Sequence, residues 1–440
     1  MRSLQLISLG CSKNTVDSEH LLAGLWDHFQ ILPESALEQK VDILLINTCG
    51  FIGDAKEESI QTILAAAERK KRGEIGQILV FGCLSQRYAA ELPALIPEVD
   101  SWCGARRLDE VFEALGVAPS EEIRTQRFSV GEKLPYAYLK ISEGCDRRCS
   151  YCAIPLIRGA HRSVPMETLV KEASLLAADG VKELILIAQD STYYGLDLYH
   201  ERALAKLLAQ LSEIEGIEWL RVHYSYPQDF PEDVLEQMAA NPKICPYMDI
   251  PLQHVSDKVL SMMHRHIGGA ATRSLVRKFR EKVPGIVLRT TMIVGHPGES
   301  DEDFRELLNF VAQAKFERLG AFRYSEEEGT YGAENYADDI PDSVKQSRLD
   351  SLMALQKDIS LEFNRSRIGT VERVLIDAES DGIFVCRSRY ESPEVDGEIL
   401  VKKFPGAAPG DFITVRISGA DEYDLIAEPL QSDARVGGEK

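Results

Sequence analysis

The sequence predicts an α/β protein in three parts: an N-terminal open parallel α/β domain, a central partial (β/α)6 barrel and a C-terminal small antiparallel β-barrel. Two series of apolar strands that alternate with amphipathic helices predict the first two parts. Five short strands punctuated by glycine after residue 370 predict the third. A chain of 440 residues is also too long for one ordinary domain. The expected divisions are 1–118, a linker at 119–134, 135–365, 366–432 and a disordered tail at 433–440.

Composition narrows the class of protein. No apolar run approaches the roughly 18 residues of a membrane span, and Met1–Gly10 is typical of a first strand, not of a signal peptide. Nine cysteines, an odd number, indicate metal ligation in a reducing cytosol and not a disulfide framework. The net charge of −20 favours a basic partner over a polyanion. We therefore expect a cytoplasmic protein that does not associate with membranes.

The first hundred residues alternate strand and helix patterns. Apolar strands are predicted at 4–9, 41–46 and 77–81, and helices at 15–29 and 55–70, each helix with apolar residues on one side. This alternation favours a parallel sheet with crossover helices.

A cysteine follows each of these three strands: Cys11, Cys49 and Cys83. Ligands bind beyond the carboxyl ends of strands in open parallel sheets, so the three thiols are expected to converge. Each has a glycine neighbour, which suits tight turns near a bulky ligand. One such cysteine would be an ordinary buried residue, but three at equivalent strand ends predict a metal cluster. Cys103, after a weaker strand pattern, is interpreted as structural.

A second set of three cysteines lies within the segment 144–152: Cys145, Cys149 and Cys152. Structural zinc sites are normally closed by four protein ligands, and no histidine follows before His161. Cysteine thiolates at close spacing are typical of iron–sulfur clusters. Three thiolates in one short loop therefore predict a cluster with one open metal position.

The segment 144–152 follows the first strand of the second series. Strands are predicted at 138–142, 184–188, 219–224, 248–252, 286–294 and 319–324, with helices such as 167–178, 204–211, 231–238 and 302–314 between them. In such barrels the chemistry lies at the C-terminal strand ends. Polar groups stand there at 189–190, 223–225, 253–254, 295–299 and 325–326. They suit a nucleotide-like cofactor, although structural hydrogen bonding is an equally good interpretation of each.

The last hundred residues predict a long helix and then a small barrel. The helix spans 341–363. Short strands follow at 371–376, 383–389, 399–401, 412–417 and 425–427, which suggests a closed barrel of the oligonucleotide-binding kind. From Arg367 to Glu428 there are seven basic and thirteen acidic residues, a net charge of −6. That sign disfavours an RNA backbone, whose binding depends on Lys and Arg.

The C-x3-C-x-Tyr-C pattern resembles the signature of the radical S-adenosylmethionine enzymes, and the whole chain resembles the methylthiotransferases among them. That family combines an N-terminal three-cysteine domain, a radical S-adenosylmethionine barrel and a C-terminal TRAM domain. The runs 8–19, 47–52, 249–254 and 324–330 resemble the branch that modifies an aspartate of ribosomal protein S12. His296 and Ser300 depart from the pattern, where an aromatic residue and a threonine are usual.

The resemblance implies a mechanism with named parts. Cys145, Cys149 and Cys152 hold a [4Fe-4S] cluster that cleaves S-adenosylmethionine to a radical, with Tyr151 and Gln189 as candidate cofactor-binding residues. Cys11, Cys49 and Cys83 hold a second [4Fe-4S] cluster for the inserted sulfur, and a second S-adenosylmethionine supplies the methyl group. An electron donor such as flavodoxin or ferredoxin is implied.

The substrate prediction rests on the acidic C-terminal barrel. We expect it to dock ribosomal protein S12, free or on the small subunit, and to present one aspartate to the barrel mouth. The same chemistry on an adenosine of transfer RNA is the alternative. A non-enzymatic iron–sulfur carrier or RNA-binding module is the rival from another class, and release of deoxyadenosine from S-adenosylmethionine would distinguish it.

Overall fold

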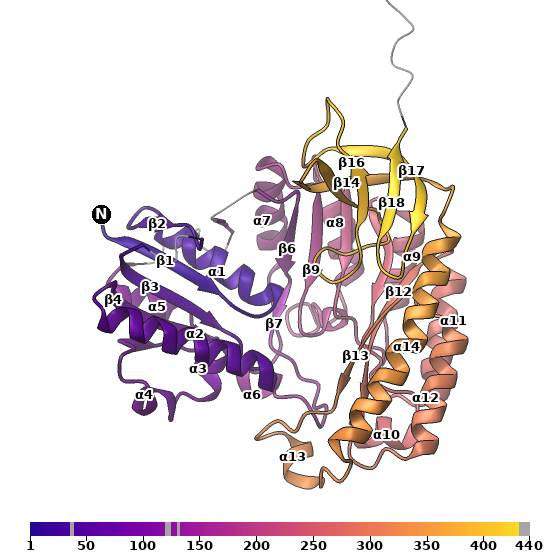
Figure 1. Ribbon diagram of the computed structural model, residues 1–440, viewed down its shortest axis with the longest axis horizontal. Helices are drawn as coiled ribbons and strands as arrows, with labels where there is room; N and C mark the ends of the chain where they lie inside the picture. The colour runs from indigo at the N-terminus through magenta and orange to yellow at the C-terminus, as the bar shows by residue number, and fades with distance from the viewer. Residues whose placement is uncertain (36–38, 119–124, 130–132, 431–440) are drawn as a thin grey trace, which may run out of the picture.

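A computed structural model describes residues 1–35, 39–118, 125–129 and 133–430, which form three packed parts (Figure 1). The expected linker at 119–134 falls largely outside the described residues, and the expected tail at 433–440 falls entirely outside them. The domain divisions stay predictions. Within the described residues, no helix is both long and apolar enough to cross a membrane.

The N-terminal part is an open parallel sheet in the order β2-β1-β3-β4-β5. The three predicted strands are β1 (Ser3–Ser8), β3 (Val41–Thr48) and β4 (Ile75–Gly82), joined by two short ones, β2 (Gln30–Leu32) and β5 (Ser101–Trp102). Helices α1 (Ser12–Leu25) and α5 (Asp109–Leu115) pack on one face, and α2 (Gly53–Lys71) and α4 (Leu92–Leu95) on the other. Both faces are covered, as the apolar runs of parallel strands require.

The central part confirms the partial barrel. Six parallel strands follow the order β13-β12-β11-β10-β9-β6. They are β6 (Tyr136–Lys140), β9 (Glu183–Ile187), β10 (Trp219–Val222), β11 (Ile244–Asp249), β12 (Val287–Val294) and β13 (Arg318–Arg323). The crossover helices are α7 (Met166–Ala178), α8 (Leu204–Ser212), α9 (Glu232–Ala240), α11 (Gly269–Lys282) and α12 (Asp301–Ala314), and shorter helices are α6 (Ile154–Arg158), α10 (Asp257–Met262) and α13 (Tyr331–Asn335).

Helix α1 lies against the inner face of this sheet. Along β9, Leu184 and Leu186 pack in the core under the outer helices. Ile185 and Ile187 point the other way and pack with Val16 of α1. The N-terminal domain therefore lies beside β6, where the sheet is open (Figure 1).

The C-terminal part confirms a small closed barrel, in the order β14-β15-β16-β18-β17. Helix α14 (Asp342–Ser366) leads into β14 (Val371–Ser380), β15 (Ile383–Arg387), β16 (Ile399–Lys402), β17 (Phe412–Ala420) and β18 (Leu425–Pro429). Buried residues such as Val374, Phe384 and Val415 form its core. The pairing is antiparallel except between β16 and β18, which are parallel.

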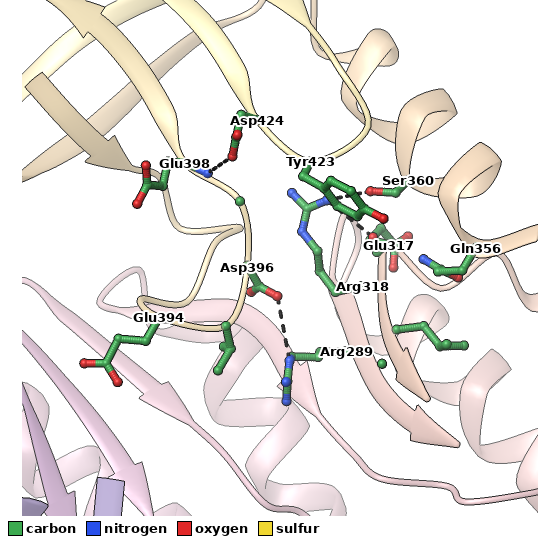
Figure 2. A pocket seen from close by; sticks show the side chains of 14 residues that line it. Arg289, Glu317, Arg318, Gln356, Ser360, Glu394, Asp396, Glu398, Tyr423 and Asp424 are labelled. Carbon is green, nitrogen blue, oxygen red and sulfur yellow. Dashed lines mark hydrogen bonds and ion pairs between the residues drawn. The ribbon is translucent and has the colours of Figure 1, made fainter. Parts of the chain in front are cut away.

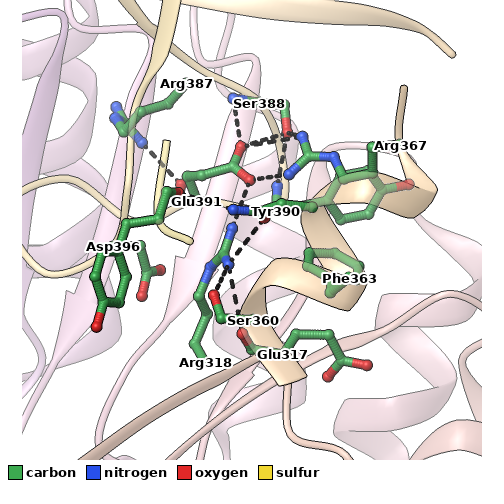
Figure 3. Close-up of polar contacts among 12 residues, drawn as sticks. Glu317, Arg318, Ser360, Phe363, Arg367, Arg387, Ser388, Tyr390, Glu391 and Asp396 are labelled. Atoms are coloured by element: carbon green, nitrogen blue, oxygen red, sulfur yellow. Dashed lines mark hydrogen bonds and ion pairs between the residues drawn. The ribbon is translucent and has the colours of Figure 1, made fainter. Parts of the chain in front are cut away.

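This small barrel is seated on the N-terminal ends of the central strands. Trp219, the first residue of β10, contacts Phe412 with ring centroids 4.8 Å apart. Glu391 is buried beside two arginines, accepting a hydrogen bond from Arg318 at 3.2 Å and others from Arg367 (Figure 3). Burial alone would raise the pKa of Glu391, but Arg367 and Arg318 lower it to about 2. A buried ionic network therefore holds the C-terminal barrel against the central strands.

A pocket of about 450 Å³ lies at the same junction, between the C-terminal barrel, α14 and the starts of β12 and β13 (Figure 2). Arg289 pairs there with Asp396 at 3.7 Å. The cysteine segment 144–152 follows the opposite, C-terminal end of β6. This geometry does not support the expectation that the C-terminal barrel presents the substrate to the mouth, because the barrel packs on the other end of the strands and reaches toward the mouth through its loop, where Ser392 contacts His223.

Candidate functional site

The structure brings Cys11, Cys49 and Cys83 to one edge of the N-terminal sheet. Cys49 directly follows β3 and Cys83 directly follows β4, while Cys11 precedes α1 as its N-cap residue. Because β1, β3 and β4 are neighbours in the sheet, their carboxyl ends lie side by side.

The side chain of Asn14 contacts the segments at all three strand ends. Its side-chain nitrogen donates to the carbonyl oxygens of Leu9 at 2.8 Å and Thr48 at 3.1 Å. The Cys83 thiol lies 3.8 Å from the Asn14 side-chain oxygen. One buried amide therefore contacts the segments of all three cysteines, a role that the sequence pattern did not reveal.

Two glycines allow the close approach of these loops. Gly10 has a φ of +93°, and a Cβ there would lie 2.8 Å from the Cβ of Cys49. Gly82 has a φ of +104°, and a Cβ there would lie 2.6 Å from the carbonyl oxygen of Thr48. Side chains at either position would push the cysteine loops apart.

The donor set suits an iron–sulfur cluster better than a single metal ion. Over the described part of the chain, no three His, Cys, Asp or Glu side chains are grouped closely enough to hold one ion. In a four-iron cluster each thiolate binds a different iron, so its ligands are spread more widely. Burial raises the pKa of Cys49 and raises that of Cys83 to about 11, and the nearby Cys11 thiol adds to both effects. The three thiols are thus close enough to interact.

The second cysteine set lies in the loop after β6 and the short strand β7 (Ser142–Glu143). The amide of Cys145 donates to Gly159 at 3.0 Å, and that of Cys152 donates to Cys149 at 3.1 Å. Burial raises the pKa of Cys145 to about 12 and that of Cys152 further. All three residues are half-buried, as suits a loop around a cluster with one open position.

Arg265 is a buried residue at this loop that sequence reasoning missed. It donates to the Cys149 sulfur at 3.6 Å and to the Tyr151 hydroxyl at 3.4 Å, and its guanidinium lies 4.2 Å over the Tyr226 ring. Tyr226 in turn donates to the Arg265 carbonyl at 2.9 Å. Tyr151, a predicted cofactor-binding residue, is therefore held beside Cys149.

Polar atoms without partners line the C-terminal strand ends. Gln189, the other predicted cofactor-binding residue, donates to Glu143 at 2.8 Å, but its side-chain oxygen has no hydrogen-bond partner among the described residues. The Ser225 hydroxyl and the Gln253 side-chain oxygen are likewise buried without one. Gln253 also has a φ of +73°, a strained conformation of the kind that clusters at binding sites. These groups fit a polar ligand such as S-adenosylmethionine.

Other strand-end groups have structural partners instead. Glu299 accepts from the Gly295 amide at 2.6 Å and pairs with Arg348 at 3.1 Å, while burial raises its pKa to about 7. The His223 ring contacts the Ser392 hydroxyl of the C-terminal barrel at 2.9 Å. Ser300, one of the two departures from the family pattern, caps α12 in a capping box with Asp303. Glu299, His223 and Ser300 therefore have structural roles.

Glu327 connects the two cysteine-bearing domains. It follows β13 and is buried, and it pairs with Lys56 and with Arg87, each at 2.8 Å. Arg87 also donates to the carbonyl of Gly50, next to Cys49, at 3.0 Å. Glu327 thus fixes the barrel against the N-terminal cysteine site.

The remaining three cysteines are packed in apolar cores. Cys103 lies in the core under α1 and α5, in agreement with its structural interpretation. Cys245 packs beside Trp219 and Tyr247, and Cys386 lies inside the C-terminal barrel.

Comparisons with known families match each part of the chain. Residues 139–311 match the radical SAM superfamily, 368–430 match the TRAM domain, and 3–104 match the family described as uncharacterized protein family UPF0004. Among solved structures, the radical S-adenosylmethionine methyltransferase TsrM from Kitasatospora setae covers 93% of this chain and 84% of its own, at a TM-score of 0.55 and 15% identity. The cobalamin-dependent radical enzyme OxsB has a TM-score of 0.51 over 81% of this chain and 56% of its own, at 13% identity. At these identities the likeness shows the fold alone. Fold, cysteine loop and family matches define a radical S-adenosylmethionine enzyme with a TRAM domain.

Curated relatives match over nearly the full length. The ribosomal protein uS12 methylthiotransferase RimO of Porphyromonas gingivalis is 50% identical over 96% of this chain and 98% of its own. Those of Flavobacterium johnsoniae and Bacteroides thetaiotaomicron are 49% and 48% identical over 97% and 98% of this chain, each over 98% of its own length. The chain belongs to the family of ribosomal protein uS12 methylthiotransferases.

Proposed function

We propose that this chain adds a methylthio group to the β-carbon of an aspartate in ribosomal protein uS12. The observation that carries the proposal is the placement of two three-cysteine sets at strand ends of two adjoining domains, in a chain about half identical to uS12 methylthiotransferases. A non-enzymatic carrier would not need polar atoms buried without a partner, among the described residues, at the strand ends of the central barrel.

Each cysteine set would hold one [4Fe-4S] cluster. Cys145, Cys149 and Cys152 would bind the cluster of the barrel, and Cys11, Cys49 and Cys83 the cluster of the N-terminal domain. With S-adenosylmethionine bound, these groups would supply radical C–H activation, a carrier for the inserted sulfur and a methyl group, chemistry that protein side chains cannot provide. Since each set offers three thiolates, one iron of each four-iron cluster would be without a protein ligand and would be open to a further group.

The residues of the chain bind and orient the cofactor. Gln189, Ser225 and Gln253 offer buried oxygen atoms, and Tyr151 offers an aromatic ring held by Arg265. Arg147 is anchored by Asp190 at 2.9 Å, and one of its buried nitrogens has no partner in the part of the chain that the structure describes, which suits a carboxylate. Tyr226 and Arg265 pack over Cys149 and keep water from that side of the loop.

Charge favours a protein substrate over transfer RNA. The chain carries a net charge of −20, and Glu326 and Glu328 are exposed beside the cysteine end of the barrel. A basic ribosomal protein is attracted to such a surface, whereas a phosphate backbone is repelled. A low-potential donor such as flavodoxin or ferredoxin would supply electrons, and the reaction would take place in the cytoplasm, on free uS12 or on the small subunit.

A competition experiment tests this proposal. Reconstituted, reduced protein is given S-adenosylmethionine with unmodified small ribosomal subunits and unmodified transfer RNA in one tube, and both products are weighed by mass spectrometry. We expect a methylthio group on one uS12 aspartate, and none with the variant in which Cys145, Cys149 and Cys152 are all alanine. A methylthio group on transfer RNA, with uS12 unmodified, would contradict the proposal.

A further inference from the structure

Arg158 joins the barrel to the N-terminal cysteine site. It is the last residue of α6, which begins two residues after Cys152, and only 4% of it is exposed. Helix α6 packs against α3 (Cys83–Arg87) of the N-terminal domain (Figure 1). The segment that carries one cysteine set therefore also places a side chain at the other.

The guanidinium of Arg158 has four partners. Its Nε donates to the Cys83 sulfur at 3.3 Å, and its Nη2 donates to the Asn14 side-chain oxygen at 2.5 Å. Its Nη1 donates to Asp17 at 2.7 Å and to Glu143 at 3.1 Å. Three of these partners belong to the N-terminal domain and one to the barrel. Such a fork fixes the position of Nε relative to the sulfur.

The charges around Arg158 already balance one another, so its hydrogen bond to Cys83 can stabilise a thiolate there. Asp17 and Glu143 both also pair with Lys140. Two cations and two carboxylates thus balance before Cys83 carries any charge. A thiolate at Cys83 would add a negative charge directly against Arg158 Nε, in a site with little water to screen it.

We propose that Arg158 is a positioning residue for the N-terminal cluster, and that its hydrogen bond to the Cys83 sulfur raises the reduction potential of that cluster. The inference rests on the proposed function, because it requires a cluster at Cys11, Cys49 and Cys83. A hydrogen bond to a ligating sulfur withdraws electron density and stabilises the reduced cluster, which carries more negative charge. Arg265 makes the corresponding contact to Cys149, so each cysteine set receives one arginine.

Arg106 provides a matched control. It lies in the N-terminal domain and donates to the carbonyls of Ile157 at 2.9 Å and Leu156 at 2.5 Å, both in α6. It therefore holds the same helix across the same junction, but within the described residues its hydrogen bonds go to backbone oxygens and not to sulfur. Arg106→Lys weakens the junction and leaves the bond to Cys83 in place.

The test is a redox titration of the N-terminal cluster alone. In full-length protein with Cys145, Cys149 and Cys152 replaced by alanine, the midpoint potential is measured by electron paramagnetic resonance for Arg158→Gln, Arg158→Lys and Arg106→Lys. For Arg158→Gln we expect a more negative potential, equivalent to about a tenfold change in the ratio of reduced to oxidised cluster, or about 59 mV for one electron. Arg158→Lys keeps the charge without the Nε donor and should shift the potential in the same direction. Arg106→Lys should leave it unchanged.

Each outcome bears on the inference. Unchanged potentials in both Arg158 variants, with the iron content of the parent, would overturn it and leave the proposed function intact. Equal shifts in the Arg106 and Arg158 variants would also overturn it, because loosening of the junction would then explain them. If the Arg158→Gln variant loses its iron while the Arg106→Lys variant keeps it, the positioning role is supported. The midpoint potential of the cluster is then measured in the Arg158→Lys variant. A parent that binds no iron at all would instead contradict the proposed function.

Discussion

Glu327 of the barrel and Arg87 of the N-terminal domain form a buried ion pair at 2.8 Å, although 240 residues separate them in the chain. Lys56 shares the same carboxylate oxygen. Since Arg87 also holds the carbonyl next to Cys49, the pair fixes the N-terminal cysteine edge against the loop after β13.

Replacing Glu327 should loosen this junction. Glu327→Gln removes the charge that Lys56 and Arg87 share, and we expect a local loss of about 1–3 kcal/mol. Hydrogen exchange of the segments around Lys56 and Arg87 measures it, and their amides should exchange faster. Glu328→Gln is the control, because Glu328 is exposed and binds Arg87 only through its backbone oxygen at 2.9 Å. Equal exchange in the two variants would contradict the role of the buried carboxylate.

The stability of the contact between the C-terminal barrel and the central strands should depend on pH through Glu391. Arginines lower the pKa of this buried carboxyl from its ordinary value of 4.5 to about 2. A lowered folded-state pKa gives stability that is complete above pH 4.5 and is lost as the pH falls toward 2. Glu391→Gln should therefore destabilise this contact by about 3–5 kcal/mol at neutral pH. The loss should become progressively smaller below pH 4.5.

Trp219 can report this loss, since its ring packs on Phe412 of the C-terminal barrel. In protein with Trp26 and Trp102 replaced by phenylalanine, denaturant titrations of Trp219 fluorescence at several pH values give the difference between variant and parent. Glu428→Gln, an exposed position in the same barrel, should have almost no effect. A difference that stays constant from pH 7 to pH 3 would rule out the ionised Glu391.

Iron content tests the two cysteine sets. Anaerobically reconstituted protein should hold about eight irons, because two four-iron clusters are expected. Replacing Cys145, Cys149 and Cys152 by alanine should leave about half. Cys103→Ala, in an apolar core, should keep the full content. A parent with only about four irons after complete reconstitution would exclude one of the two sites.

The two clusters should differ in role. Cys49→Ala should still cleave S-adenosylmethionine to deoxyadenosine under reducing conditions, because the barrel loop is intact, but it should form no methylthio product. Cys149→Ala should lose both. Chromatography of deoxyadenosine together with mass spectrometry of uS12 measures the two activities. If Cys49→Ala abolishes cleavage as completely as Cys149→Ala does, this division of roles is wrong.

Local patterns predicted much of this architecture. Apolar runs that end before a glycine and a cysteine placed Cys11, Cys49 and Cys83 correctly, because strand direction in a parallel sheet determines which ends meet. Edge strand β2 was missed, since three residues give too short a pattern. The parallel pairing of β16 with β18 also leaves no local signal.

Contacts between distant segments could not be predicted in this way. Arg158 and Cys83 are 75 residues apart, and neither position has a periodicity that points to the other. The seat of the C-terminal barrel depends on Glu391 meeting Arg318, again across a domain junction. Net charge suggested a substrate for this barrel, but it carries no information on which end of the strands the barrel covers.

The long sequence separation between Glu327 and Arg87 has a consequence for biosynthesis. The N-terminal domain leaves the ribosome first, with its three cysteine segments already on one sheet edge. Arg158 reaches that edge only after β6 and the cysteine loop have been made, and Glu327 only when 240 further residues have followed Arg87. A nascent chain therefore lacks the contact that Glu327 makes beside the N-terminal cysteine site until residue 327 of 440 has been made.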